Sequence, residues 1–169
     1  MDARRASAAA LVVAVALAGG YWVWRAYLRG DEAIIRERLD ALAAEVNEGA
    51  ADALGLVARA AKIGSFFTEN VVVYLGEGTA PIEGRETVMG MAARLQPRTA
   101  AFTLALDDVN VRLTGEGTAE VDLTATFTRH EQEPGNSSID AREFDVRLRK
   151  IEGKWLIERV DGVEPLNKR

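Results

Sequence analysis

Cysteine is absent from the chain, and histidine occurs only once among the 169 residues, at His130. Without cysteine the chain has no disulfide framework, thiolate zinc site, iron–sulfur cluster or cysteine nucleophile. A single histidine cannot build a polyhistidine metal centre within one chain. The sequence therefore predicts neither a bound metal nor another cofactor.

Positive charge is scarce over most of the chain. The net charge is −5, but residues 1–30 contain four arginines and one aspartate, so the remaining 139 residues carry −8. A domain this acidic repels a phosphate backbone, which argues against nucleic acid as a partner. Apolar residues make up 48% of the chain and charged residues 28%. This composition and length suit one folded domain with a short appendage.

Charge is also absent from Ala6 to Trp24, a run of 19 residues near the N-terminus. As a helix this run would span about 28 Å, close to the thickness of a bilayer's hydrocarbon core. Its C-terminal end carries Tyr21, Trp22 and Trp24, and such rings favour the headgroup layer. The sequence therefore predicts a membrane anchor, a single transmembrane helix within residues 1–30.

A cleaved signal peptide is the alternative for this segment. Arg4 and Arg5 precede the apolar run, and Ala16-Leu17-Ala18 resembles a cleavage site. We favour an uncleaved anchor because the apolar run continues beyond that site into the aromatic residues. Arginine counts on the two sides favour a cytoplasmic body, whereas the short basic N-terminus resembles an export signal. We expect a single-pass protein of a bacterial-type inner membrane with an extracytoplasmic domain.

Residues 31–165 are predicted to form one domain, followed by a short tail at 166–169. Three stretches have helical character, and each ends at a glycine, polar or proline signal. The first helix has Ile35, Leu39, Leu42 and Val46 on one stripe and ends at Asn47-Glu48-Gly49. The second is the alanine-rich stretch Asp52–Ile63, with Leu54, Val57 and Ala61 on one side. The third is Gly84–Leu95, and Pro97 follows its end. A short β-branched strand, Val71–Tyr74, separates the second helix from the third.

From Ala101 onward the apolar period changes from helical to alternating. Phe102, Leu104 and Leu106 alternate in one parity and Val109, Val111 and Leu113 in the other, so the phase slips at Asp107-Asp108. Such a slip predicts a β-bulge. Further alternating strands run through Ala119–Phe127, Phe144–Leu148 and Trp155–Val160. Helices followed by a meander of strands predict an α+β fold, a curved antiparallel sheet of four to six strands packed on three helices. We expect Leu39, Leu42, Phe102, Phe127, Phe144 and Trp155 to be buried.

Three segments carry a family resemblance. They are the helix end Asn47-Glu48-Gly49 with Ala51–Leu54, the segment Phe67–Val73 with Pro81–Glu86, and the closing hairpin Phe144–Lys150 with Gly153–Ile157. The start of a helix at Gly84-Arg85-Glu86 after a short strand is the most specific of these features. Together the segments resemble the nuclear transport factor 2-like superfamily, which includes the SnoaL-like cyclases and ketosteroid isomerase. The resemblance covers residues 32–162 and implies a cone-shaped fold.

The resemblance also implies a cone interior that can hold a hydrophobic ligand. Some members of the superfamily use a carboxylate base with a donor that stabilises an oxyanion, a chemistry that requires both groups beside the substrate. The candidates here are Asp107 and Asp108 as base and Tyr74 as donor. No residue matches the isomerase's catalytic residues position by position, so we favour two solvated aspartates at a bulge.

Two short polar segments between the predicted strands could each form a functional site. His130 with Glu131 and Glu133 could form an acid–base or metal cluster, although such a run at a strand end is more often a solvated loop. Asn136-Ser137-Ser138 fits a glycosylation acceptor, a motif too short to carry an argument. We assign no function to either segment.

The outward face of the strand 119–128 carries Asp122, Thr124, Thr126 and Thr128, which we expect to form a binding surface. The face is neither apolar enough for an obligate interface nor charged enough to serve only as solvated surface. We expect it to contact a second copy of the chain or a membrane protein. The sequence thus favours a membrane-anchored, non-catalytic binding or assembly module. The alternative is a SnoaL-like or ketosteroid-isomerase-like enzyme acting on a small lipophilic substrate.

Overall fold

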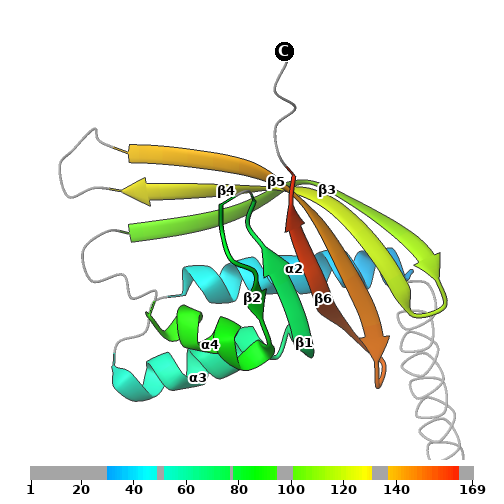
Figure 1. The fold of residues 1–169 in the computed structure, drawn as a ribbon, viewed down its shortest axis with the longest axis horizontal. Helices are drawn as coiled ribbons and strands as arrows, with labels where there is room; N and C mark the ends of the chain where they lie inside the picture. Colours follow the sequence, from blue (N-terminus) through cyan, green and yellow to red (C-terminus); the bar gives the residue numbers. More distant parts are fainter. Residues whose placement is uncertain (1–29, 49–51, 77, 95–100, 131–136, 164–169) are drawn as a thin grey trace, which may run out of the picture.

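The computed structural model describes residues 30–48, 52–76, 78–94, 101–130 and 137–163. In these ranges the chain forms three helices and one six-stranded sheet (Figure 1). None of the helices in the described ranges is long and apolar enough to cross a membrane. The predicted anchor, with Tyr21, Trp22 and Trp24, lies outside the described residues.

The three helices agree with the sequence prediction to within one or two residues. They are α2 (Asp31–Asn47), α3 (Ala53–Gly64) and α4 (Arg85–Arg94). Asp52 caps α3, because its side chain accepts a hydrogen bond of 2.7 Å from the backbone N–H of Gly55. Gly84 precedes α4 with a φ of +85°, a left-handed conformation that glycine adopts without steric cost.

The strands form one sheet in the order β2-β1-β6-β5-β4-β3. Their bounds are β1 (Phe67–Tyr74), β2 (Ile82–Glu83), β3 (Ala101–Gly115), β4 (Thr118–His130), β5 (Ser137–Ile151) and β6 (Lys154–Gly162). Neighbouring strands are antiparallel except β1 and β6, which are parallel. The predicted antiparallel meander is therefore confirmed for β3 to β6. The parallel pair differs from the prediction because β1, from the helical half of the chain, joins the far side of the meander.

The predicted β-bulge is present in β3. Asp107 pairs with Thr124 of β4, but the next paired residue is Asn110, opposite Asp122. Asp108 takes a φ of +51° within this interruption. The extra residue returns Val109 and Val111 to the face that Leu104 and Leu106 occupy, where they pack on the core.

The core lies between the concave face of the sheet and the helices, and the sheet curls around α2 in Figure 1. Of the residues predicted to be buried, Leu39, Phe144 and Trp155 are buried. Leu42 and Phe127 are half-buried and pack against the core. Phe102 lies in β3, but its side chain is outside the described part of the structure.

Helix α3 turns two large apolar residues outward. Leu54 is 82% exposed and Val57 is 68% exposed, whereas Ala60 and Ile63 are buried with Arg59. The sequence analysis placed Leu54, Val57 and Ala61 together on one side of this helix, and that side is the exposed one in the structure. Helix α3 packs mainly on α4, and its buried side closes one end of the space beneath the sheet.

Candidate functional site

A cavity of about 300 Å³ lies between the concave face of the sheet and the three helices. Residues from all three helices and all six strands line it. They are Leu39, Leu42, Val46, Arg59, Ile63, Phe67, Val73, Leu75, Ile82, Val88, Met91, Ala92, Leu104, Leu106, Leu123, Ala125, Phe127, Phe144, Val146, Ile157 and Val160. Its volume is at the lower end of the range for small-molecule sites in proteins.

The cavity follows from the alternating pattern of the strands. In β4 the inward residues are Leu123, Ala125 and Phe127, so every second side chain faces the interior. The small side chains of Ala125 and of Ala92 on α4 leave room that a larger residue would fill. The sheet curls around the helices, and side-chain packing leaves this space between them unfilled.

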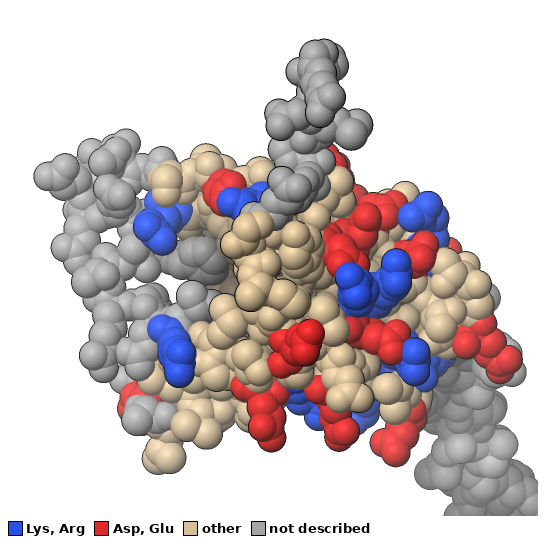
Figure 2. All heavy atoms as spheres, in the orientation of Figure 1, with Lys and Arg blue, Asp and Glu red and all other residues tan. Residues whose placement is uncertain are grey.

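The cavity opens to solvent on one side. Two of its lining residues are substantially exposed, Leu75 at 38% and Met91 at 42%. In Figure 2, which keeps the orientation of Figure 1, the surface is hollowed between the strands above and helix α4 below. Where described residues border this hollow, they are shown in tan, the colour of residues other than Lys, Arg, Asp and Glu.

The chemistry of the lining is almost entirely apolar. Among the lining residues that the structure describes, Arg59 is the single polar one; no carboxylate, histidine, tyrosine or hydroxyl side chain accompanies it. General acid–base catalysis requires a proton-transferring group within hydrogen-bond reach of the substrate. The described lining can therefore bind an apolar molecule but offers it no such group.

Arg59 is held at the end of helix α2. Its Nε donates a hydrogen bond of 3.1 Å to the backbone carbonyl of Glu45, and its Nη2 donates to the carbonyl of Val46. These carbonyls belong to the last turn of α2, where a cation is favoured by the helix dipole. The third nitrogen, Nη1, is buried and has no hydrogen-bond partner in the described part of the chain.

The predicted catalytic candidates do not line the cavity. Tyr74 lies at the end of β1, half-buried, and its backbone pairs with Asp161 of β6. Asp107 and Asp108 are exposed on β3, where the carboxylate of Asp107 accepts a hydrogen bond of 3.1 Å from Thr126. Three strands separate β1 from β3 in the sheet. The structure therefore does not join Tyr74 to these aspartates in one site.

The predicted binding residues lie on the opposite face of the sheet from the cavity. Asp122, Thr124, Thr126 and Thr128 are half-exposed along β4, and the residues between them face the core. The structure thus places all four on one surface, as the alternation predicted. This surface remains a predicted interface.

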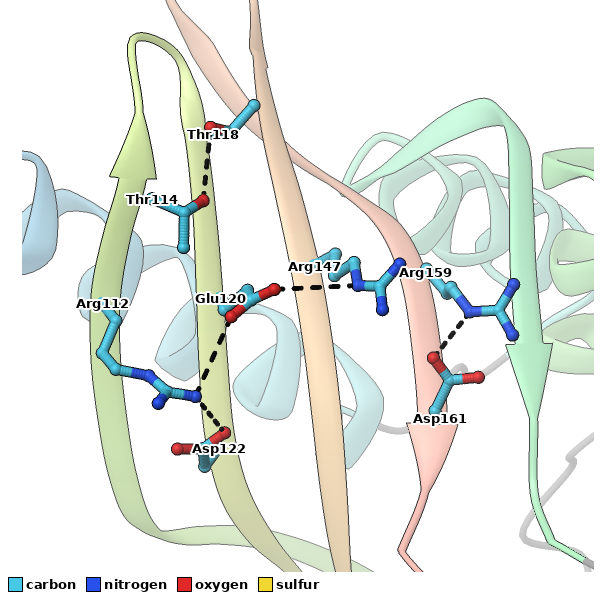
Figure 3. Close-up of polar contacts among 8 residues, drawn as sticks. All are labelled: Arg112, Thr114, Thr118, Glu120, Asp122, Arg147, Arg159 and Asp161. Carbon is cyan, nitrogen blue, oxygen red and sulfur yellow. Dashed lines mark hydrogen bonds and ion pairs between the residues drawn. The ribbon is translucent and has the colours of Figure 1, made fainter.

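Oppositely charged residues form a network at one end of this outer surface (Figure 3). The guanidinium of Arg112 lies 3.1 Å from the carboxylate of Asp122. Glu120 pairs with Arg147 across β4 and β5 at 4.0 Å, and Arg159 pairs with Asp161 on β6 at 2.6 Å. These pairs are substantially exposed, so each contributes little to stability by itself.

Three aspartates form a row through this network. Asp122, Asp145 and Asp161 are direct partners on β4, β5 and β6. Partial burial raises the pKa of Asp145, and the negative charge and hydrogen bond of Asp122, followed by the charge of Asp161, raise it further. The row lacks metal-ligand geometry: no cluster suited to a metal ion occurs within the described ranges.

Several sequence predictions fall outside the described residues. Glu131, Glu133 and Asn136 are among them, and so is the side chain of His130, whose backbone ends β4. The structure therefore adds nothing to the interpretation of this segment.

Arg59 is the cavity residue that the sequence analysis did not single out. It stands alone among alanines in Ala58–Ala61, four residues before the buried Ile63. An arginine at helical spacing from an apolar residue, on a helix with few other charges, is the signal that could have drawn attention to it. Its burial depends on α2 carbonyls 13 and 14 residues earlier in the chain.

Comparisons with known proteins agree with the architecture. Residues 49–161 match the family model of the SnoaL-like domain. No match was found among curated proteins. Many solved structures are similar; one, from Novosphingobium aromaticivorans, is described as a nuclear transport factor 2-like protein with a cystatin-like fold. It has a TM-score of 0.65 and 16% identity, and the match covers 88% of this chain and 90% of that one.

Two further similar structures carry names of enzymes. A proposed scytalone dehydratase from Novosphingobium aromaticivorans has a TM-score of 0.62 and 10% identity, covering 78% of this chain and 83% of that one. A proposed dehydratase of the nuclear transport factor 2-like family from Streptomyces avermitilis has a TM-score of 0.60 and 17% identity, covering 79% and 95%. At these identities the similarity establishes the fold alone.

Proposed function

Since the chain belongs to the SnoaL-like domain family, we propose that it is a non-catalytic binding module whose cavity holds a small apolar molecule. The observation that carries this proposal is the lining of the cavity, which is apolar except for Arg59. Apolar ligands gain about 25 cal/mol for each Å² of surface they remove from water. Because the lining residues that the structure describes include no proton-transfer group, they support binding rather than turnover.

Equilibrium dialysis of radiolabelled decanol against the full chain tests this function. The variant Ala125→Phe places a ring in the cavity from β4 and should abolish saturable binding. The control Ala41→Phe adds the same ring at an exposed position on α2 and should bind decanol as the parent does. Any decanol held elsewhere is common to all three proteins. Equal decanol binding by Ala125→Phe and the parent would reject the cavity as the site.

The N-terminal segment supports a location for this module. We propose that residues 1–30 anchor the domain to a bacterial-type inner membrane, with the domain on the extracytoplasmic side. The support is the uncharged run Ala6–Trp24 with its aromatic end. The full chain should remain with membranes after carbonate extraction. Edman sequencing that begins at Gly19 would show instead that the segment is a cleaved signal peptide.

The outer face of the sheet supports a proposal about partners. We propose that this face contacts a second copy of the chain or a membrane protein. The half-exposed row of Thr124, Thr126 and Thr128 is continuous with the network around Asp122, where positive and negative side chains alternate. Such alternation suits pairing of the face with a copy of itself.

An enzyme of lipophilic substrates is the second candidate function. The names of the two proposed dehydratases favour it, whereas the apolar lining of the described cavity does not. Dehydration requires a base that removes a proton and an acid that assists the leaving hydroxyl. Mass spectrometry of hydroxylated ring compounds incubated with the full chain tests this candidate, and loss of one water above the protein-free rate would support it.

A further inference from the structure

One residue of the cavity wall carries a buried positive charge whose hydrogen bonds are incomplete. Arg59 is only 9% exposed and lines the cavity. Two of its three guanidinium nitrogens bind backbone carbonyls of α2, and Nη1 has no partner in the described residues. A buried donor without a partner is costly, and more so when it is charged.

No carboxylate neutralises this guanidinium within the described ranges. Glu45 is close in the structure, since its carbonyl accepts from Arg59, but its carboxylate pairs with Lys62 at 3.4 Å. The carbonyls of α2 supply only the partial negative charge of a helix end. An isolated buried charge is stabilised most by a negatively charged partner at hydrogen-bond distance.

We propose that the cavity selects hydrophobic carboxylates, and that Arg59 binds the carboxylate while the apolar walls bind the chain or ring. The inference rests on the proposed function, because it requires that the cavity be a binding site, and it adds the chemical class of the ligand. A carboxylate supplies the negative charge that the guanidinium lacks and accepts a charge-assisted hydrogen bond, whereas a neutral head group brings no charge. The hydrogen bonds that hold Nε and Nη2 leave Nη1 as the donor for the ligand.

The dimensions of the cavity set the size of the apolar part. A group of water size occupies about 30 Å³, so 300 Å³ holds roughly ten non-hydrogen atoms. Nη1 is buried, so the proposal requires a change of side-chain rotamer that exposes it to the ligand, and such changes are common on binding. A saturated carboxylate of ten carbons is therefore a suitable probe.

Parallel dialysis of decanoate and decanol against the full chain tests the inference. The two probes share a chain length and differ in the charge of the head group. The unaltered protein should bind decanoate about 10- to 100-fold more tightly than decanol, the range expected for one charge-assisted hydrogen bond. The variant Arg59→Met keeps an apolar stem of similar length and should lose this preference while it still binds decanol.

Arg38→Met is the matched control. Arg38 is also a partly buried arginine on a helix, bound through Nε and Nη2 to the carbonyls of Trp155 and Ser65, but it does not line the cavity. This variant should keep the preference for decanoate. Circular dichroism establishes that both variants are folded.

The possible outcomes distinguish the proposed preference for carboxylates from the proposed binding of apolar ligands in the cavity. Equal affinity of the unaltered protein for the two probes would overturn the inference and leave the binding cavity in place, and this measurement needs no variant. A preference that survives in folded Arg59→Met would also overturn it. Failure of both probes to bind would overturn the proposed function itself.

Discussion

Two aspartate side chains have pKa values that depart from the ordinary value in opposite directions, and the cause of each lies in its immediate partners. Asp31 accepts hydrogen bonds from Lys150 at 2.7 Å and from the ring N–H of Trp155 at 3.1 Å. These bonds lower its pKa, Lys150 contributing most. Asp145 has the opposite displacement, because burial and neighbouring negative charge disfavour its ionised form. Asp31 thus stabilises the fold when ionised, whereas ionised Asp145 destabilises it.

Asp31→Asn should destabilise the domain at neutral pH by about 1 kcal/mol, a value reduced because the pair is partly exposed. A lowered carboxyl pKa contributes stability that is complete above the unfolded value near 3.8 and is lost as pH falls through the folded value. The difference between variant and parent in urea unfolding should therefore shrink below pH 4. A difference that stayed constant from pH 7 to pH 3 would contradict this assignment.

Asp145→Asn should act with the opposite sign and raise the free energy of unfolding at pH 7 by about 0.5 kcal/mol, since the site is largely exposed. A raised carboxyl pKa means that the ionised group opposes folding above its folded pKa, and that this effect disappears below the unfolded value near 3.8. Urea titrations at pH 7 and pH 3 measure the gain and its loss. Destabilisation at pH 7 would show that Asp145 makes a favourable contact instead.

Among the elements of the fold, the bulge in β3 gives a structural reason for Asp107 and Asp108, the two residues that the sequence analysis considered as a catalytic base. Asp108 occupies a left-handed conformation in the interruption between Asp107 and Asn110. Aspartate is one of the few residues other than glycine that tolerates this region. The bulge keeps the apolar residues on either side of it on the core face, so its role is in the register of β3.

Asp108→Gly should therefore preserve or raise stability, by up to about 1 kcal/mol, because glycine adopts a positive φ without strain. Asp108→Val should destabilise by a similar amount or more, since a β-branched residue is strained there. Thermal unfolding of the two variants measures the difference. Equal melting temperatures for the two would contradict a conformational role for this position.

The elements also differ in how far the sequence could predict them. Alternation in β4 indicated correctly that Val121, Leu123 and Ala125 face inward, because a strand of period two permits only two orientations. Helix α3 was placed correctly, but the side with Leu54 and Val57 is exposed rather than packed inward. Arg59 is buried where it donates hydrogen bonds to backbone carbonyls of α2, a contact with another helix that has no local signature in the sequence. Pairings between distant segments, such as β1 beside β6, have no local signature in the sequence.

The whole molecule presents two faces of the sheet with different properties. The concave face encloses an apolar cavity, and the outer face carries threonines and paired charges. The faces differ because the strands are amphipathic: alternate side chains of each strand point to opposite faces of the sheet. We therefore propose ligand binding at the concave face and association at the outer face.

Thr126→Arg should weaken association without unfolding the domain. The side chain is half-exposed on the outer face, where it donates to Asp107, and a long charged residue would obstruct a partner packed there. Sedimentation velocity and pull-down of the full chain in mild detergent measure the assembly. If the variant keeps the mass and partners of the parent, the outer face is not the binding surface.

Methyl NMR spectra of the full chain, titrated with decanol, test directly whether the cavity is the binding site. Isoleucine, leucine and valine methyl groups report both on the cavity and on the exposed apolar side of α3. We expect shifts at Leu123 and Ile157, which line the cavity, and none at Leu54 and Val57, which are exposed on α3. Shifts confined to Leu54 and Val57, or no saturable shift at all, would contradict this expectation.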